Sequence, residues 1–424
     1  MNIKNIKLAV IGLGYVGLPL AVEFSKKREV IGYDIKKKRI QELKLGIDIT
    51  AEVLKRDLIK LKNIKFTYFK KDLKNANCFI ITVPTPIYKN KKPDLRPLIK
   101  ATQIVSDVLK MGDLIIYEST VFPGCTEDVC VPILEKRSGL KFNKDFFCGY
   151  SPERNNPGDK LRKITSIKKI TSGSTLKISN LVDALYRQII FAGTHKAPSI
   201  KVAEAAKVIE NVQRDLNIGL INELSILLNK MNIDTQEVLE AAGSKWNFIP
   251  FRPGLVGGHC IGVDPYYLID KAKKVGQSLD VVSSARKIND GMGDYVASML
   301  MMEMKRKFIK LKNSKILIMG LTFKENCPDL RNSGVSNVIK KLKKFSCKLD
   351  LYDPWANKYE VKKIYGVFPI NKPKSNFYNG IILAVAHDIF KKMKIKSINN
   401  LRKKNSLFFD LKHLFPKEAS DLRL

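Results

Sequence analysis

The chain has 424 residues, 45% apolar and 28% charged, and this ordinary globular mixture argues against a disordered chain, a collagen or a disulfide-held scaffold. Lysine and arginine number 76 against 41 acidic residues, so the formal net charge is +35. A field of this sign attracts anions such as nucleotide sugars, nucleic acids or an acidic membrane surface. Because lysine is spread along the whole chain, we attribute most of the charge to compositional drift. A basic nucleic-acid-binding or membrane-surface protein remains an alternative.

The sequence also predicts a compartment. The longest apolar stretch, residues 8–22, contains three glycines and a proline and is too short for a transmembrane helix. The N-terminus runs directly into a strand-like segment with no small-residue cleavage site, so no signal peptide is expected. Seven cysteines without paired spacing suit a reducing environment. We therefore expect a cytoplasmic protein.

The first third of the chain alternates short apolar runs with helical patterns. We expect strands at 7–12, 30–33, 78–83 and 114–117, and a helix at 15–27. This alternation is typical of βαβ units and a parallel sheet.

A long helix is expected over residues 199–231, because apolar residues recur there at spacings of three and four. Further strands, expected at 315–319, 349–352, 380–385 and 406–411, predict a second, smaller α/β unit. The predicted fold class is α/β, with two Rossmann-like, doubly wound parallel-sheet domains joined by a long helical linker.

A glycine-rich motif directly follows the first predicted strand. Gly12, Gly14 and Gly17 fit the pattern G-x-G-x-x-G at a helix start, and Asp34 follows Gly14 by 20 residues. The glycines allow a tight turn and the close approach of a pyrophosphate, whose charge the helix N-terminus stabilises. A carboxylate at Asp34 would bind the ribose hydroxyls of NAD and repel the extra phosphate of NADP. The basic run at 36–39 weighs against this preference, but we favour NAD.

A second motif, Gly257-Gly258-His259-Cys260, places a cysteine behind two glycines, where the backbone can approach a substrate closely. From this segment alone, Cys260 is either a reactive thiol or a buried structural cysteine. Adjacent side chains seldom face each other, so His259 is not expected to form a protease-like pair with it. Four scattered histidines and no C-x-x-C pair provide no zinc framework, and we expect no metal site.

Lys207 and Asn211 lie four residues apart on the predicted long helix and therefore project from one face. A partly buried ammonium at Lys207, aimed at a reacting carbonyl, could stabilise an oxyanion. From the spacing alone, a solvated helix face is the simpler explanation.

Seven motifs occur in order over nearly the whole chain. They are G-L-G-Y-V-G-L-P-L-A from residue 12, V-P-T-P from 83, E-S-T-V from 118, S-P-E-R from 151, K-V-I-E-N from 207, G-G-H-C from 257 and G-L-T-F-K from 320. Together they resemble the nucleotide-sugar 6-dehydrogenases. The resemblance is greatest to the branch that acts on UDP-N-acetylglucosamine and UDP-N-acetylgalactosamine in bacterial surface polysaccharide synthesis. Asn155 stands where this branch is expected to have isoleucine, a departure that could alter the fit of the sugar.

The resemblance implies three domains: an NAD-binding domain at 1–198, a helical linker and dimerisation domain at 199–308, and a UDP-sugar-binding domain at 309–424. It implies a cytoplasmic homodimer, without nucleic acid or membrane partners, that supplies a sugar acid for capsule or O-antigen. The reaction would oxidise C6 of the UDP-N-acetylhexosamine from alcohol to carboxylate, with two NAD⁺ and one water consumed.

The resemblance also implies how the chemistry is divided. Cys260 would trap the aldehyde as a thiohemiacetal, which a second hydride transfer converts to a thioester. Lys207 would stabilise the negative oxygen of each tetrahedral state, with Asn211 hydrogen-bonding nearby.

Proton transfers and the hydrolytic water would fall to Glu153 and Asp264, with Thr120 helping to position the water. The implied cofactor-binding residues are Gly12, Gly14, Tyr15, Val16, Gly17, Asp34, Arg39, Pro84, Thr85, Thr120 and Arg331. The implied substrate-binding residues are Glu153, Arg154, Lys207, Asn211, Arg252, Gly257 and Lys324.

Other dehydrogenases fit some of these motifs. UDP-N-acetylmannosamine or UDP-glucose could be the substrate, because the choice of sugar depends on pocket contacts that a sequence does not display. A two-electron β-hydroxyacid dehydrogenase shares the glycine motif and a helix with Lys and Asn four apart. It has no use for Cys260 or a second sheet, and it would release one NADH per substrate instead of two.

Overall fold

The computed structural model describes residues 2–153, 164–258 and 260–424. The chain forms two compact units, which are described separately below. Unit 1 comprises Met1–Glu210 and Tyr266–Gln277, and unit 2 comprises Asn211–Pro265 and Ser278–Leu424.

Unit 1 is built on an eight-stranded sheet with the order β3-β2-β1-β4-β5-β6-β7-β8. Strands β1 to β6 are parallel, β7 is antiparallel to β6, and β8 is parallel to β7. The strand order reverses between β1 and β4, which is the switch point of a doubly wound fold. The strands are β1 (Leu8–Ile11), β2 (Val30–Tyr33), β3 (Ile64–Thr67), β4 (Cys78–Ile81), β5 (Asp113–Tyr117), β6 (Phe146–Tyr150), β7 (Lys169–Gly173) and β8 (Thr194–Lys196).

Uninterrupted apolar runs explain the central strands, since a parallel strand covered on both faces has no polar side. Every residue of β1 and of β4 is buried. The four strands predicted in this part of the chain are confirmed, with ends that differ by at most two residues. The sequence did not predict β3, β6, β7 or β8. Strand β7 begins at the buried Lys169, and a lysine interrupts the apolar pattern by which a buried strand is predicted.

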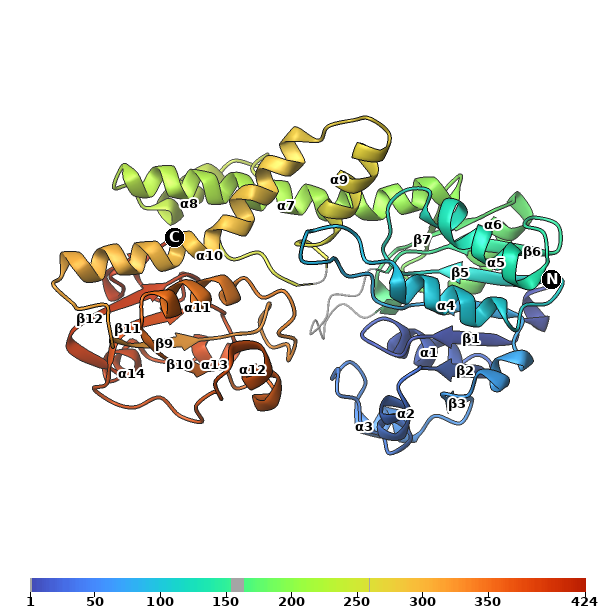
Figure 1. Ribbon diagram of the computed structural model, residues 1–424, viewed down its shortest axis with the longest axis horizontal. Coiled ribbons are helices and arrows are strands. Elements are labelled where there is room, and N and C mark those ends of the chain that lie inside the picture. The colour runs from blue at the N-terminus through green and yellow to red at the C-terminus, as the bar shows by residue number, and fades with distance from the viewer. Residues whose placement is uncertain (1, 154–163, 259) are drawn as a thin grey trace. The chain divides into compact units, whose positions relative to one another are not determined.

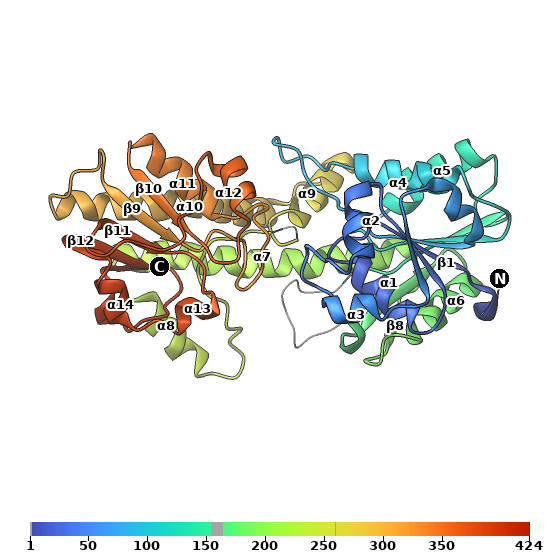
Figure 2. The same cartoon turned by 90° about the horizontal axis from the view of Figure 1, so that it is seen from below.

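Helices cover both faces of this sheet, with α1 and α6 on one side and α4 and α5 on the other (Figure 1 and Figure 2). Helix α1 begins at Gly17, two residues later than predicted, because the glycine-rich turn continues through Val16. The helices before the linker are α1 (Gly17–Ser25), α2 (Lys37–Lys44), α3 (Lys55–Ile59), α4 (Arg96–Ser106), α5 (Val131–Ser138) and α6 (Leu176–Arg187). Short helical turns are η1 (Ile3–Asn5), η2 (Lys70–Asn75), η3 (Thr126–Cys130) and η4 (Ile164–Ser166).

Helix α7 (Ile200–Lys230) confirms the predicted long helix to within one residue at each end. It passes from unit 1 into unit 2. In unit 2 it packs closely on α10 (Asp280–Arg306). The helices are so close at Gly219 that a Cβ added there would lie 2.9 Å from the Cβ of Ala285. The glycine therefore permits this approach of the two helices.

Unit 2 contains a five-stranded parallel sheet with the order β10-β9-β11-β12-β13. One face packs against α10, α11 and α12, and the other against α13 and α14 (Figure 2). The four strands predicted here are confirmed, β9 residue for residue. The strands are β9 (Lys315–Met319), β10 (Lys348–Tyr352), β11 (Tyr378–Leu383), β12 (Arg402–Asp410) and β13 (Leu422–Arg423). The remaining helices of unit 2 are α8 (Thr235–Gly243), α11 (Val335–Lys344), α12 (Lys358–Tyr365), α13 (Asp388–Lys391), α14 (Ile395–Asn399) and the turn η5 (Lys417–Ala419). Helix α9 (Asp264–Lys274) begins in unit 2 and lies mostly in unit 1.

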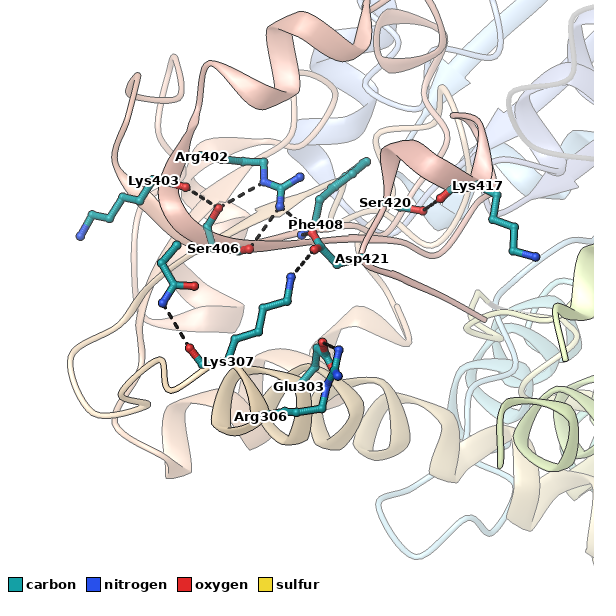
Figure 3. Close-up of polar contacts among 11 residues, drawn as sticks. Glu303, Arg306, Lys307, Arg402, Lys403, Ser406, Phe408, Lys417, Ser420 and Asp421 are labelled. Atoms are coloured by element: carbon teal, nitrogen blue, oxygen red, sulfur yellow. Dashed lines mark hydrogen bonds and ion pairs between the residues drawn. The ribbon is translucent and has the colours of Figure 1, made fainter. Parts of the chain in front are cut away.

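Asp421 fastens the end of the chain to this sheet (Figure 3). Its carboxylate accepts hydrogen bonds from Lys307 at 2.5 Å, from Arg402 at 2.6 Å and from the backbone N–H of Phe408 at 2.8 Å. Burial opposes ionisation, but the bonds from Lys307 and Phe408 outweigh it and lower the pKa of Asp421. The cluster thus links the C-terminal end of α10 to β12 and β13.

The predicted α/β fold class is confirmed, with one large and one smaller doubly wound sheet. The boundaries of the three predicted domains remain a prediction.

Candidate active site

The glycine-rich turn after β1 has the geometry of a dinucleotide site. Gly12 adopts a φ of +95°, which favours glycine. A Cβ at Gly17 would lie 1.9 Å from the carbonyl oxygen of Gly12, so only glycine fits at the start of α1. A Cβ at Gly14 would meet nothing within 4 Å, which leaves the turn open to a ligand. The half-buried Tyr15 and Val16 complete the turn, and the N-terminus of α1 favours a pyrophosphate there.

Asp34 follows β2, at the same edge of the sheet. Its carboxylate accepts the backbone N–H of Leu13 at 3.0 Å and that of Lys36 at 2.9 Å, and it remains half-exposed and able to bind a ribose. Arg39 is buried and donates to the Leu13 carbonyl at 2.9 Å and to Asp48 at 2.7 Å. Because Arg39 supports the turn from within, it is not presented to the extra phosphate of NADP. These residues fit NAD.

The loops that follow β4 and β5 begin at the same edge of the sheet as the glycine-rich turn, beside that turn. Pro84 is exposed and Thr85 is buried, while Thr120 is half-buried. The hydroxyl of Ser119 donates to the carbonyl of Val83 at 2.6 Å and so joins the two loops. The structure therefore brings these three predicted residues to the strand ends next to the glycine-rich turn.

Glu153 follows β6 and is 7% exposed. Its carboxylate lies 3.6 Å from the ammonium of Lys169, which also contacts Glu118 at 2.8 Å. The sequence motifs imply no role for Lys169 or Glu118. A carboxylate directly after the apolar run of β5 was the available signal, but Lys169 lies 51 residues beyond Glu118 and is brought there only by the fold.

The sheet of unit 2 repeats this turn with a different outcome. Gly320 follows β9 with a φ of +88°, and the N–H of Leu321 donates to Asp353 at 2.6 Å, as Leu13 donates to Asp34. Asp353 is buried, accepts three further backbone N–H groups and lies 3.1 Å from His387. Its carboxylate is fully engaged, so this sheet offers no ribose-binding acid of the kind found at Asp34.

Cys260 is exposed, whereas the other six cysteines are all buried. The interpretation of Cys260 as a buried structural cysteine is therefore wrong. Two glycines before it press against the loop after β9: a Cβ at Gly257 would lie 2.9 Å from the Asn332 carbonyl oxygen, and one at Gly258 would lie 2.6 Å from the ring of Phe323. Asn332 also accepts the Gly258 N–H at 3.3 Å and donates to its carbonyl at 3.2 Å.

The carbonyl of Cys260 accepts the N–H of Asp264, the first residue of α9, at 2.9 Å. Asp264 in turn accepts a hydrogen bond from the Asn211 amide of α7 at 2.5 Å, and both side chains are 2% exposed. Lys207, one helical turn earlier on α7, is 5% exposed. The solvated-face explanation of Lys207 and Asn211 is therefore wrong.

Three further predicted site residues lie on loops of unit 2: Arg252 and Lys324, predicted to bind the substrate, and Arg331, predicted to bind the cofactor. Arg252 is exposed and donates to Gln236 at 2.7 Å. Lys324 and Arg331 follow β9, and Arg331 forms a two-pronged pair with Asp329, the shortest contact being 2.6 Å.

Arg154, Asn155 and His259 lie outside the described residues. Within residues 2–153, 164–258 and 260–424, no group of three His, Cys, Asp or Glu side chains could hold a metal ion. No helix in the same ranges is long and apolar enough to cross a membrane.

Three domain signatures match in order: the NAD binding domain of the UDP-glucose/GDP-mannose dehydrogenase family at residues 6–190, its central domain at 201–291 and its UDP binding domain at 317–417. The chain belongs to this family. It is an NAD-dependent UDP-sugar dehydrogenase, with NAD as its cofactor and a UDP-sugar as its substrate.

Similar proteins match this chain over nearly its whole length. UDP-N-acetyl-D-glucosamine 6-dehydrogenase of Salmonella typhi is 56% identical over 100% of both chains. The protein of that name from Pseudomonas aeruginosa is 58% identical over 99% of this chain and 100% of its own. The solved UDP-D-ManNAc dehydrogenase of Pyrococcus horikoshii is 30% identical, covers 97% of this chain and 96% of its own, and has a TM-score of 0.88.

Proposed function

We propose that the protein oxidises C6 of a UDP-N-acetylhexosamine, UDP-N-acetylglucosamine or UDP-N-acetylgalactosamine, to the uronic acid through a covalent intermediate on Cys260. The observation that carries this proposal is the exposed thiol of Cys260, four residues before α9, on a glycine loop that the UDP-binding part of the chain holds in place. The 56–58% identity to two UDP-N-acetyl-D-glucosamine 6-dehydrogenases favours the gluco sugar.

NAD⁺ held at Gly12, Gly14, Gly17 and Asp34 would supply the acceptor for the hydride that leaves C6 in each of two oxidations. After the first, the C6 hydroxyl has lost its proton and become an aldehyde, and the thiolate of Cys260 adds to it to give a thiohemiacetal. The second hydride leaves a thioester, and water then displaces the sulfur to give the carboxylate and the free thiol. Cys260 lies four residues before α9, and its carbonyl accepts the N–H of Asp264, the first residue of that helix.

Lys207 and Asn211 are assigned to the negative oxygen of the tetrahedral states. An ammonium and an amide held on one buried helix face stabilise such charge well, because little water competes with them. Asp264 is fixed by Asn211 next to the nucleophile loop and suits proton transfer there. Glu153 and Thr120 are assigned to the protons and water of the hydrolytic step.

The substrate's diphosphate and uridine are assigned to Arg154, Arg252, Lys324 and the loop at Gly257, and Arg331 to the cofactor phosphates. Two phosphates need positive charge, which the first three residues supply.

We further propose a cytoplasmic homodimer with domains at 1–198, 199–308 and 309–424, which supplies the sugar acid to surface polysaccharide synthesis. Leu220, Leu224 and Leu227 support the dimer, because they form an exposed apolar row on α7 at spacings of four and three.

The test is the number of NADH molecules released per limiting sugar nucleotide, measured for the N-acetylgluco, N-acetylgalacto and N-acetylmanno sugars and for UDP-glucose. We expect two NADH from the gluco or galacto sugar, no sustained turnover for Cys260→Ala, and an unchanged ratio for the buried control Cys347→Ser. A ratio of two only with the manno sugar or UDP-glucose would replace the substrate but keep the mechanism. One NADH per sugar, or normal turnover by Cys260→Ala, would refute the proposal in favour of a two-electron dehydrogenase.

A further inference from the structure

A buried cluster of ionisable side chains lies behind Glu153 in unit 1. Glu118 follows β5 and is 1% exposed, Lys169 begins β7 and is 2% exposed, and Tyr186 on α6 is fully buried. None of the three is assigned a part in the proposed reaction. Charged side chains this deeply buried are costly unless they pair, so their arrangement calls for an explanation.

Strand pairing places the lysine opposite the glutamate. Strands β6 and β7 are antiparallel, with Gly149 opposite Gly173 and Tyr150 opposite Ser172. Continued past the end of β6, the same register sets Glu153 opposite Lys169. The lysine ammonium then donates to the carbonyl of Pro152 at 3.1 Å, so it holds both the backbone and the side chain at this point.

The cluster holds two carboxylates and one ammonium. Lys169 contacts Glu118 at 2.8 Å and Glu153 at 3.6 Å, and the hydroxyl of Tyr186 donates to the other oxygen of Glu118. With both acids ionised, the buried group carries a net negative charge. When Glu118 takes up a proton, Lys169 and Glu153 form a balanced pair.

We infer that Lys169 is a positioning residue for Glu153, and that Glu118 competes with Glu153 for the charge of Lys169. The inference deepens the proposed function, since it rests on the role proposed for Glu153. Burial raises the pKa of Glu118 to about 7, although Lys169 opposes the shift, so the competition changes near neutral pH.

Several elements present titratable groups to this cluster. Among the described residues these are Glu118 after β5, Glu153 after β6, Lys169 on β7, Tyr186 on α6, and Cys78 on β4, which acts on Tyr186. Burial raises the pKa of Tyr186 and of Cys78, to about 12 for Cys78, so both stay neutral when Glu118 titrates.

The experiment measures kcat/KM against pH for the wild type, Glu118→Gln, Lys169→Met and Tyr186→Phe, with UDP-N-acetylglucosamine and NAD⁺. In Glu118→Gln, Lys169 interacts with Glu153 alone and favours its ionised form more strongly. The acid limb of the kcat/KM profile should therefore move to lower pH by about one unit. Lys169→Met removes that charge, so the limb should move to higher pH by about one unit. Tyr186→Phe weakens the ionised form of Glu118 and should shift the limb as Glu118→Gln does, but less.

Asp215→Asn is the matched control, because it also neutralises a buried carboxylate that pairs with a cation, Arg286 at 2.6 Å. It should lower stability and leave the acid limb in place. Shifts of Glu118→Gln and Lys169→Met in the same direction, or no shift in either, would overturn the inference. If Lys169→Met does not fold, Glu118→Gln and Tyr186→Phe decide it by the same criterion. Glu153→Gln separates the two proposals, since full activity in that variant would remove the proposed role of Glu153 itself.

Discussion

At the scale of single residues, the functional candidates are distinguished by a solvent exposure that is unusual for their residue type. Cys260 carries an exposed thiol, while Lys207 and Asp264 are polar side chains that the fold buries. Buried polar groups are costly and exposed thiols are reactive, so both departures need a reason. The proposed oxidation supplies one reason for all three residues.

Alkylation under native conditions tests the state of the thiol. Iodoacetamide should modify one cysteine per chain, Cys260, because the other six are buried. Intact mass and peptide mapping measure the result, and a saturating UDP-sugar should slow the modification. Rapid modification of a second cysteine, or modification of another cysteine at an earlier time than Cys260, would contradict this account.

Asp34→Ala tests the cofactor assignment. Loss of the carboxylate should raise the Kd of NAD about tenfold, the effect of roughly one charged hydrogen bond, and lessen discrimination against NADP. Isothermal titration with both cofactors measures it, and the exposed Asp57→Ala serves as the control. An unchanged Kd would show that the ribose lies elsewhere.

At the scale of elements, the reactive loops are held by contacts from other parts of their own unit. Asn222 of α7 accepts the Gly254 N–H at 2.8 Å and donates to its carbonyl at 3.1 Å, and Asn332 clamps Gly258 in a similar way. In unit 1, Glu204 of α7 accepts the N–H groups of Gly124 at 2.5 Å and Thr126 at 2.9 Å. Such clamps hold catalytic groups in place before a substrate arrives.

Gly258→Ala should disturb the nucleophile loop. The added Cβ meets Phe323 at 2.6 Å on a backbone with a φ of +88°, so the loop must move. We expect kcat to fall at least about tenfold, with NAD affinity unchanged. Gly262→Ala is the control in the same loop, because its Cβ would meet no atom closer than 3.9 Å. Equal losses in both variants would show that the close packing is not what matters.

Glu204→Gln should change stability in a pH-dependent manner. Burial raises the pKa of Glu204 to about 7, despite hydrogen bonds from Thr126 and Gly124 that favour ionisation. The folded state therefore retains a proton that the unfolded state loses near pH 4.5, and the contribution of Glu204 to stability falls as the pH rises from about 4.5 to 7. The free energy of unfolding of the wild type minus that of Glu204→Gln should decrease from pH 5 to pH 8, measured by urea denaturation. A difference that is flat or increases with pH would contradict the assignment.

At the scale of the whole molecule, the sequence predicted the elements whose signals are local. The apolar run of β1, the glycines of the following turn and Asp34 lie within one βαβ segment, and so they could be found together. Lys169 could not, because its pairing with Glu118 and Glu153 depends on the order of strands in the sheet. Burial of Lys207 was equally out of reach, since helix spacing gives the face of a residue but not what covers it.

The central claim for the proposed reaction is the covalent intermediate on Cys260. The direct measurement is the mass of the intact chain, acid-quenched during a single turnover with UDP-N-acetylglucosamine and NAD⁺, followed by mapping of the modified peptide. We predict a transient increase equal to the acyl form of the sugar nucleotide, located on Cys260 and absent from Cys260→Ser. A complete turnover to the uronic acid with no adduct at any time, or with the adduct on another residue, would contradict the account.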